Sequence, residues 1–89
     1  MRAQIVIQGL VQGVGYRFFV VARAQQYHIT GYVQNLPNGN VRVVAEGDKG
    51  VLLSFIEDLR IGPASAHITA VDVQWNEEES GFTEFEVKF

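Results

Sequence analysis

One segment of the chain has residue types and spacing that suit the binding of an anion. It reads Gly9-Leu10-Val11-Gln12-Gly13-Val14-Gly15-Tyr16-Arg17, after a short apolar run that ends a strand-like segment. Phe18 to Ala22 follow it as the start of an amphipathic helical pattern. Glycines at such a turn allow positive φ values and let several backbone amides approach one ligand. The segment therefore predicts a glycine-rich turn between a strand and a helix, with the makings of an anion site.

The start of the predicted helix strengthens this interpretation. Residues 12–16 offer no Ser, Thr, Asp or Asn to accept hydrogen bonds from the first helical amides. Arg17 lies at the same end, where the helix dipole disfavours a cation by roughly 0.3–1 kcal/mol. A bound phosphate would satisfy the amides and the arginine together. A plain turn, with water on the amides and a solvated Arg17, fits these residues equally well, because glycine-rich turns are common.

Composition narrows the class of protein. The 89 residues, 47% of them hydrophobic, predict a single domain over 1–89, and the absence of cysteine excludes disulfides and cysteine nucleophiles. A net charge of −3 argues against broad attraction to nucleic acid or to anionic membranes. The run Glu77-Glu78-Glu79 is interpreted as a solvated turn rather than a metal site. With no targeting or membrane-spanning pattern, we expect a soluble cytoplasmic protein.

The remaining pattern predicts an ordered set of elements. A helix is expected over about 17–27, followed by a strand at 31–35, a turn at 36–40 marked by Asn38-Gly39, and a returning strand to Glu46. A second helix begins after Asp48 as N-cap and ends at Gly62-Pro63. Strands follow at 68–75 and 82–89, the latter with Phe85, Val87 and Phe89 on one face.

This order predicts an α+β, ferredoxin-like βαββαβ sandwich, with an antiparallel sheet, two helices on one face and a short C-terminal edge strand. A covered sheet face and small size make a monomer the expected state. Because many unrelated functions share this fold, the site must decide the function.

Two segments resemble those of a known family. GLVQGVGYR at 9–17 fits the pattern G-x-V-Q-G-V-x-F/Y-R of the acylphosphatases, and residues 31–47 fit their second pattern, a Gly-aromatic pair, an Asn, then Gly-x-Val and a closing Gly. Gly62-Pro63, Val71-x-Val73-x-Trp75 and Phe85 extend the resemblance over nearly the whole chain. It is closer to the free-standing small enzymes than to the related domain inside a larger hydrogenase-maturation protein. The resemblance implies hydrolysis of the carboxyl-phosphate bond of acyl phosphates to a carboxylate and inorganic phosphate, without metal or organic cofactor.

The resemblance also implies roles for individual residues. Arg17 corresponds to the family's phosphate-binding arginine and Asn35 to its water-orienting asparagine, although Asn35 alone would be interpreted as a turn residue. The remaining phosphate contacts would come from the backbone cradle of Gln12, Gly13, Val14, Gly15, Tyr16 and Arg17. This assignment is chemically sensible, because a carboxylate leaving group with a pKa of about 4 needs no general acid. Amides and a guanidinium then suffice to hold and neutralise the phosphoryl oxygens.

Several questions stay open at this point. A non-enzymatic phosphate- or anion-binding ferredoxin-like module is the alternative function, and an RNA-binding module is disfavoured by charge and by the absence of its aromatic motif. Gln34 and Leu36 depart from residues common in the family. The C-terminal carboxylate of Phe89 is a candidate partner for Arg17. The acyl group of the natural substrate is not specified.

Two further expectations concern packing. Tyr16 is expected to pack beneath the cradle. His28, near the end of the first helix, is expected to adopt a left-handed cap conformation.

Overall fold

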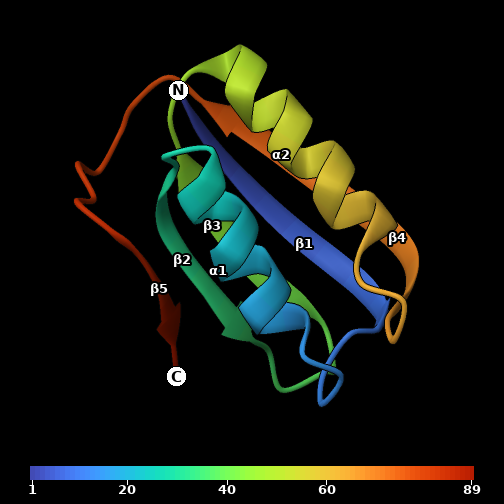
Figure 1. The fold of residues 1–89 in the computed structure, drawn as a ribbon. Coiled ribbons are helices and arrows are strands. Elements are labelled where there is room, and N and C mark those ends of the chain that lie inside the picture. Colours follow the sequence, from blue (N-terminus) through green and yellow to red (C-terminus); the bar gives the residue numbers. More distant parts are fainter.

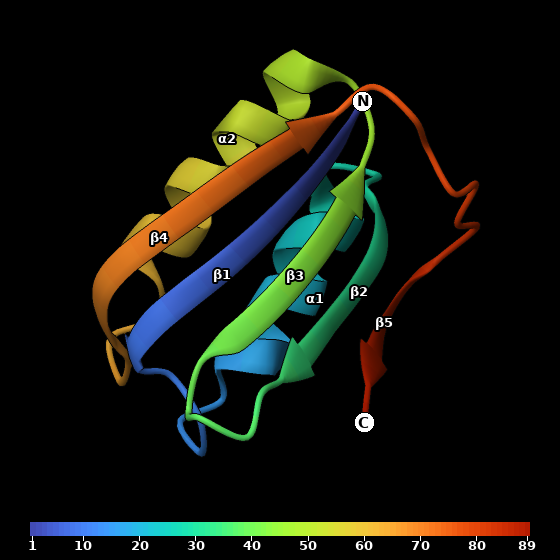
Figure 2. The ribbon, with the colours of Figure 1, turned by 180° about the vertical axis from the view of Figure 1, so that it is seen from behind.

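The computed structural model describes residues 1–89 as a five-stranded sheet with two helices on one face (Figure 1). The elements in chain order are β1 (Arg2–Leu10), α1 (Tyr16–Gln26), β2 (Thr30–Asn35), β3 (Val41–Glu46), α2 (Lys49–Ile61), β4 (His67–Asn76) and β5 (Phe85–Lys88). The strand order is β4-β1-β3-β2-β5. Seen from behind, the other face of the sheet carries no helix (Figure 2). The predicted ferredoxin-like arrangement is confirmed.

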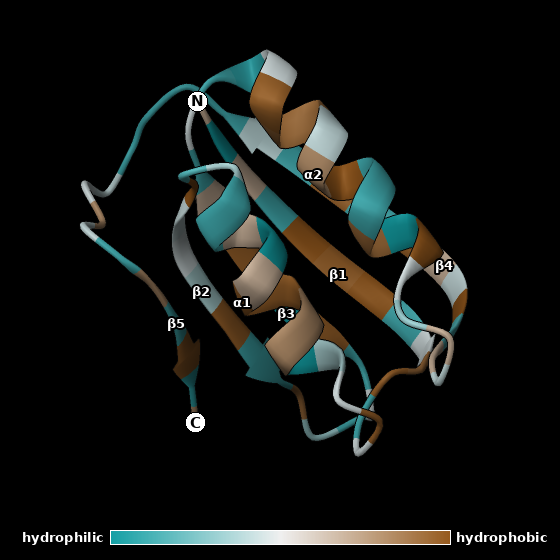
Figure 3. Cartoon of the chain, in the orientation of Figure 1, coloured by the Kyte–Doolittle hydropathy of each residue, from teal (hydrophilic) through white to brown (hydrophobic).

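The core lies between the sheet and the helices, because each strand alternates in hydropathy. On β1 the inward residues Ala3, Ile5 and Ile7 are fully buried, and an apolar stretch of this strand lies behind the helices in Figure 3. The other fully buried residues come from β2, β3, both helices and the turn after β1, including Val33, Val41, Val43, Ala45, Val20, Ala24, Leu52, Phe55, Leu59 and Val11. Burying each large apolar side chain contributes about 1.5–3 kcal/mol, so this layer fixes the helices on the sheet.

The last strand differs in detail from its prediction. It covers Phe85–Lys88 rather than 82–89, and it pairs with β2 in parallel, whereas every other pairing in the sheet is antiparallel. Phe85 is buried against Phe55, with ring centroids 6.1 Å apart. Phe89 does not share this environment, since its side chain is 97% exposed. The strand ends one residue earlier, so Phe89 extends beyond the sheet.

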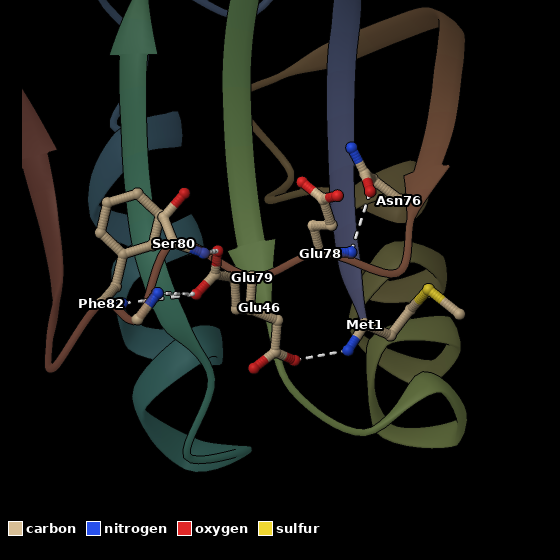
Figure 4. A network of polar contacts seen from close by, with 8 residues as sticks. Met1, Glu46, Asn76, Glu78, Glu79, Ser80 and Phe82 are labelled. Carbon is tan, nitrogen blue, oxygen red and sulfur yellow. Dashed lines mark hydrogen bonds and ion pairs between the residues drawn. The ribbon is translucent and has the colours of Figure 1, made fainter.

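A buried carboxylate holds the segment that leads into β5. Glu46, at the end of β3, is 3% exposed and accepts hydrogen bonds from the backbone amides of Ser80, Gly81 and Phe82 at 2.5, 3.1 and 3.4 Å (Figure 4). The acidic run before them is exposed, as a solvated turn should be. Its Glu79 also pairs with the N-terminal ammonium group. This segment is therefore anchored to the beginning of the chain and to the end of β3.

The helix boundaries follow their local signals closely. His28 adopts φ 57°, which confirms the left-handed conformation expected after α1. Asp48 occupies the N-cap of α2 as predicted, although its side chain makes no capping hydrogen bond. Gly62 closes α2 with φ 68°. None of the helices is long and apolar enough to cross a membrane.

Candidate active site

The turn between β1 and α1 presents an unbroken series of free backbone donors. Gly13 and Gly15 have φ values of 74° and 77°, and Gly15 is the N-cap of α1 with no side-chain cap. The first helical hydrogen bond runs from the amide of Phe19 to the carbonyl of Gly15 at 3.1 Å. No backbone N–H from Gln12 to Phe18 donates to an acceptor in the protein. Successive free amides interrupted by left-handed residues form the concavities that bind anions in proteins.

A small cavity of about 210 Å³ lies at this turn, lined by Val11, Gly13, Gly15, Tyr16, Arg17 and Phe18. A Cβ atom added to Gly13 or Gly15 would meet nothing within 4 Å, so these glycines are required by their φ values and not by space. Arg17 forms no ion pair with any carboxylate. Its guanidinium therefore has its charge available for a ligand at the positive end of α1.

The buried side chain of Tyr16 connects the start of α1, next to the cradle, to the end of α2. Its side chain is 1% exposed, and its hydroxyl donates to the carbonyl of Leu59 at 2.8 Å. That carbonyl lacks the usual helical donor, because the residue four positions on is Pro63, which has no N–H. Burial raises the pKa of Tyr16, so the phenol remains a hydrogen-bond donor. The expected packing of Tyr16 beneath the cradle is confirmed, and it also completes the end of α2.

A second hydrogen bond joins the turn to the region at the end of α2. The hydroxyl of Ser65, in the loop after α2, donates to the carbonyl of Val14 at 2.7 Å. With Tyr16 bound to α2, two separate contacts connect the turn to one neighbouring region. Such contacts limit the movement of the unpaired amides in this turn.

Gln12 connects the cradle to the hairpin that carries Asn35. Its side-chain amide donates to the carbonyls of Leu36 and Asn40 at 2.8 and 2.9 Å. The hairpin is also closed by a hydrogen bond from the amide of Leu36 to the carbonyl of Asn40 at 2.8 Å. In Figures 1 and 2 the turn after β1 and the turn after β2 lie side by side. The sequence interpretation placed Gln12 only in the phosphate cradle and missed this link, since a carbonyl partner leaves no mark on residue type.

Asn35 is the last residue of β2 and lies opposite Val41 in the ladder. Its Oδ1 atom is buried and has no hydrogen-bond partner. A buried acceptor without a partner costs about 1–3 kcal/mol. The two family departures beside it have simple roles: Gln34 lies opposite Lys88 of β5, and Leu36 contributes the carbonyl bound by Gln12.

Arg17 meets the C-terminal residue through an aromatic ring. Its guanidinium carbon lies 5.4 Å from the centroid of the Phe89 ring, within the range of a cation–π contact. No ion pair joins the two residues. The proposed pairing with the C-terminal carboxylate is therefore not observed, and the ring takes its place beside the guanidinium.

The largest cavity of the molecule is elsewhere. About 710 Å³ in volume, it lies over the helix-free face and is lined by residues including Arg2, Gln4, Tyr32, Arg42 and Phe82. It contains none of the free amides of the cradle, so size does not identify the candidate site. Nowhere do three or more His, Cys, Asp or Glu side chains gather into a group that could hold a metal ion.

Comparison with known proteins assigns the family. The family model described as Acylphosphatase matches residues 3–87. A protein named Acylphosphatase from Thermus thermophilus is 46% identical over 86 residues, which is 97% of each chain. The crystal structure of acylphosphatase from Bacillus subtilis superposes with a TM-score of 0.97 at 32% identity, covering 99% of this chain and 98% of that one. An acylphosphatase structure from Coxiella burnetii gives a TM-score of 0.91 at 31% identity, covering 98% and 90%.

A βαββαβ sandwich with a glycine-rich turn of unpaired amides between the first strand and the first helix defines the structural class. The chain belongs to the acylphosphatase family. These comparisons support an acyl phosphate hydrolase and give no support to the alternative of a non-enzymatic anion-binding module.

Proposed function

We propose that the cradle Gln12, Gly13, Val14, Gly15, Tyr16 and Arg17 holds the phosphoryl group of an acyl phosphate while Asn35 orients the attacking water. The observation that carries this proposal is the series of unpaired amides from Gln12 to Phe18, beside an arginine without an ion pair. The link from Gln12 to the Asn35 hairpin brings both parts to the same end of the molecule. The substrate class is acyl phosphates, and the product is inorganic phosphate.

The chemistry needs little beyond positioning. Water attacks phosphorus in line with the bond to the acyl oxygen, that bond breaks, and its electron pair leaves with the carboxylate. The amides and the Arg17 guanidinium stabilise the charge on the three phosphoryl oxygens. The carboxamide of Asn35 hydrogen-bonds the water and fixes its approach. A phosphoryl oxygen takes the proton of the water, so no strong protein base is required.

Hydrolysis of benzoyl phosphate and acetyl phosphate in EDTA tests the activity and its independence of metal. Arg17→Ala should lose both turnover and affinity for inorganic phosphate. Asn35→Ala should lose turnover by about 10²-fold or more and retain phosphate affinity, because Asn35 acts on the water. Gln34→Ala, at the neighbouring strand position, is the matched control and should retain both.

The outcomes separate the alternatives. Phosphate binding without turnover in the unmodified chain would indicate an anion-binding module. Equal losses of turnover and phosphate affinity in the Arg17 and Asn35 variants would contradict the division of labour.

We also propose that residues 1–89 form one domain that acts as a monomer in the cytoplasm without nucleic-acid or membrane partners, in keeping with the net charge of −3.

A further inference from the structure

A second cavity adjoins the phosphate cradle. It has a volume of about 220 Å³ and is lined by Arg17, Phe18, Val87 and Phe89. Arg17 and Phe18 also line the cradle cavity, so these two residues border both cavities. The strand β5 contributes Val87, and Phe89 follows it with its ring beside Arg17.

The lining of this second cavity is apolar apart from Arg17. Phe18 and Phe89 are 81% and 97% exposed, the highest values among the large hydrophobic residues of the chain. Exposed aromatic side chains that gather at one place commonly mark a binding surface. Here two of them lie around the arginine assigned to the phosphoryl group, which argues for a ligand that is charged at one end and apolar at the other.

An acyl phosphate has this form. A single oxygen joins its acyl carbon to phosphorus, so a phosphoryl group in the cradle places the acyl group within a few bonds of Arg17. We propose that the cavity formed by Phe18, Val87 and Phe89 is the acyl-binding site, and that it selects acyl phosphates with apolar, above all aromatic, acyl groups. This inference rests on the proposed function of the cradle.

The charges around the cavity favour this class of substrate over others. Apart from Arg17, the side chains of the lining are apolar, so none of them can pair with the charge of a second phosphate. Lys88, the nearest cation along β5, lies over the ring of Tyr32, with its Nζ 4.6 Å from the ring centroid. An aromatic acyl ring can instead stack against Phe18 and Phe89.

The test compares two substrates that differ only in the acyl group. The kcat/KM values of benzoyl phosphate and acetyl phosphate are measured for the unmodified protein, Phe18→Ala, Phe89→Ala and the conservative Phe89→Leu. Leu53→Ala is the matched control, because Leu53 is 49% exposed on α2 and outside both cavities. We expect the unmodified protein to prefer benzoyl phosphate, and each alanine variant to lower the benzoyl-to-acetyl ratio about 10-fold. Phe89→Leu should restore part of the ratio, and Leu53→Ala should leave it unchanged.

Binding of benzoylphosphonate and acetylphosphonate, measured by calorimetry, gives a readout that does not require turnover. A preference for the benzoyl compound that is lost in Phe18→Ala and Phe89→Ala supports the acyl site, whether or not any substrate is hydrolysed. If this preference is found but no substrate is hydrolysed, the proposed function is refuted and the acyl site is not. A benzoyl-to-acetyl ratio that stays unchanged in both alanine variants, in turnover and in binding, overturns the acyl site and leaves the proposed function standing.

Discussion

Replacing Tyr16 by Phe tests how the cradle is supported. The Tyr16 hydroxyl is the donor for the Leu59 carbonyl at 2.8 Å, and Pro63 cannot supply the helical N–H that would replace it. The substitution therefore leaves a buried acceptor without a partner. The aromatic ring, which stacks on Phe19 with centroids 6.1 Å apart, is retained, so the change isolates the hydrogen bond.

The expected loss follows from the burial of this contact. An orphaned buried acceptor costs about 1–3 kcal/mol in the free energy of unfolding. For a chain of this size each kcal/mol lowers Tm by about 4–8 °C. Urea titration and thermal unfolding of Tyr16→Phe should both show this decrease. Affinity for inorganic phosphate should change little, because the contact proposed between Tyr16 and phosphate is made by the backbone amide, which the substitution keeps.

The same residue predicts a pH dependence. Because burial raises the pKa of Tyr16 above its ordinary value of 10.0, the unfolded chain releases this proton at lower pH than the folded one. The stabilisation is complete below pH 10 and decreases as pH rises above that value, by up to about 1.4 kcal/mol per pH unit. The unmodified protein should lose stability in this range more steeply than Tyr16→Phe.

Tyr27→Phe is the matched control. The Tyr27 hydroxyl also makes a hydrogen bond, to the Asp58 carboxylate at 2.7 Å, but that carboxylate is partly exposed and water can replace the phenol. A smaller loss is expected. Equal stabilities of Tyr16→Phe and the unmodified protein, with the same alkaline slope, would refute the role assigned to the Leu59 contact.

Three further substitutions test the β2–β3 hairpin and its link to the cradle. Gln12→Glu replaces the side-chain amide that donates to two hairpin carbonyls by a carboxylate, which cannot donate. Because Asn35 would lose its position, turnover should fall more than phosphate affinity. The steady-state kcat measures turnover and the inhibition constant of phosphate measures affinity, and equal losses in the two would contradict this role of Gln12. Gly31→Ala places a Cβ 1.9 Å from the backbone oxygen of Val44 and should lower the free energy of unfolding by more than about 3 kcal/mol. In the same hairpin, a Cβ on Gly39 meets nothing within 4 Å, so Gly39→Ala should lower it by only about 1–2 kcal/mol, because of its φ of 94°. Urea titration that gives the two glycine variants the same stability would argue against the close approach of β2 and β3.

Local signals were sufficient for most of the fold. The uncapped start of α1 and the left-handed His28 depend on neighbours a few residues away, and both are observed. The element order follows from hydrophobic periodicity, which reports which residues face a core. The glycines and the missing cap indicated a turn with unpaired amides before α1, and the structure has it; the binding of phosphate by this turn and Arg17 stays a prediction.

Long-range partners were beyond the reach of the sequence. Alternation in residues 82–89 indicates a strand, but the direction of its pairing with β2 is set by the path of the chain over the sheet. Glu46 ends its strand as a charged residue, and nothing in the sequence shows that three amides from 80–82 surround it. The side-chain bonds of Gln12 and Tyr16 end on carbonyl oxygens, which every residue carries.

The position of β1 in the sheet determines when the chain can fold. Although Arg17 and Asn35 lie in the first half of the sequence, β1 lies between β3 and β4, and β2 lies between β3 and β5. The cradle also depends on Leu59 and Ser65, and the ring beside Arg17 is the final residue. On a ribosome, the turn that carries Arg17 could not make these contacts until the chain had emerged past Ser65. Pairings this distant along the chain slow folding, since the entropy of closing long loops is lost before their contacts form.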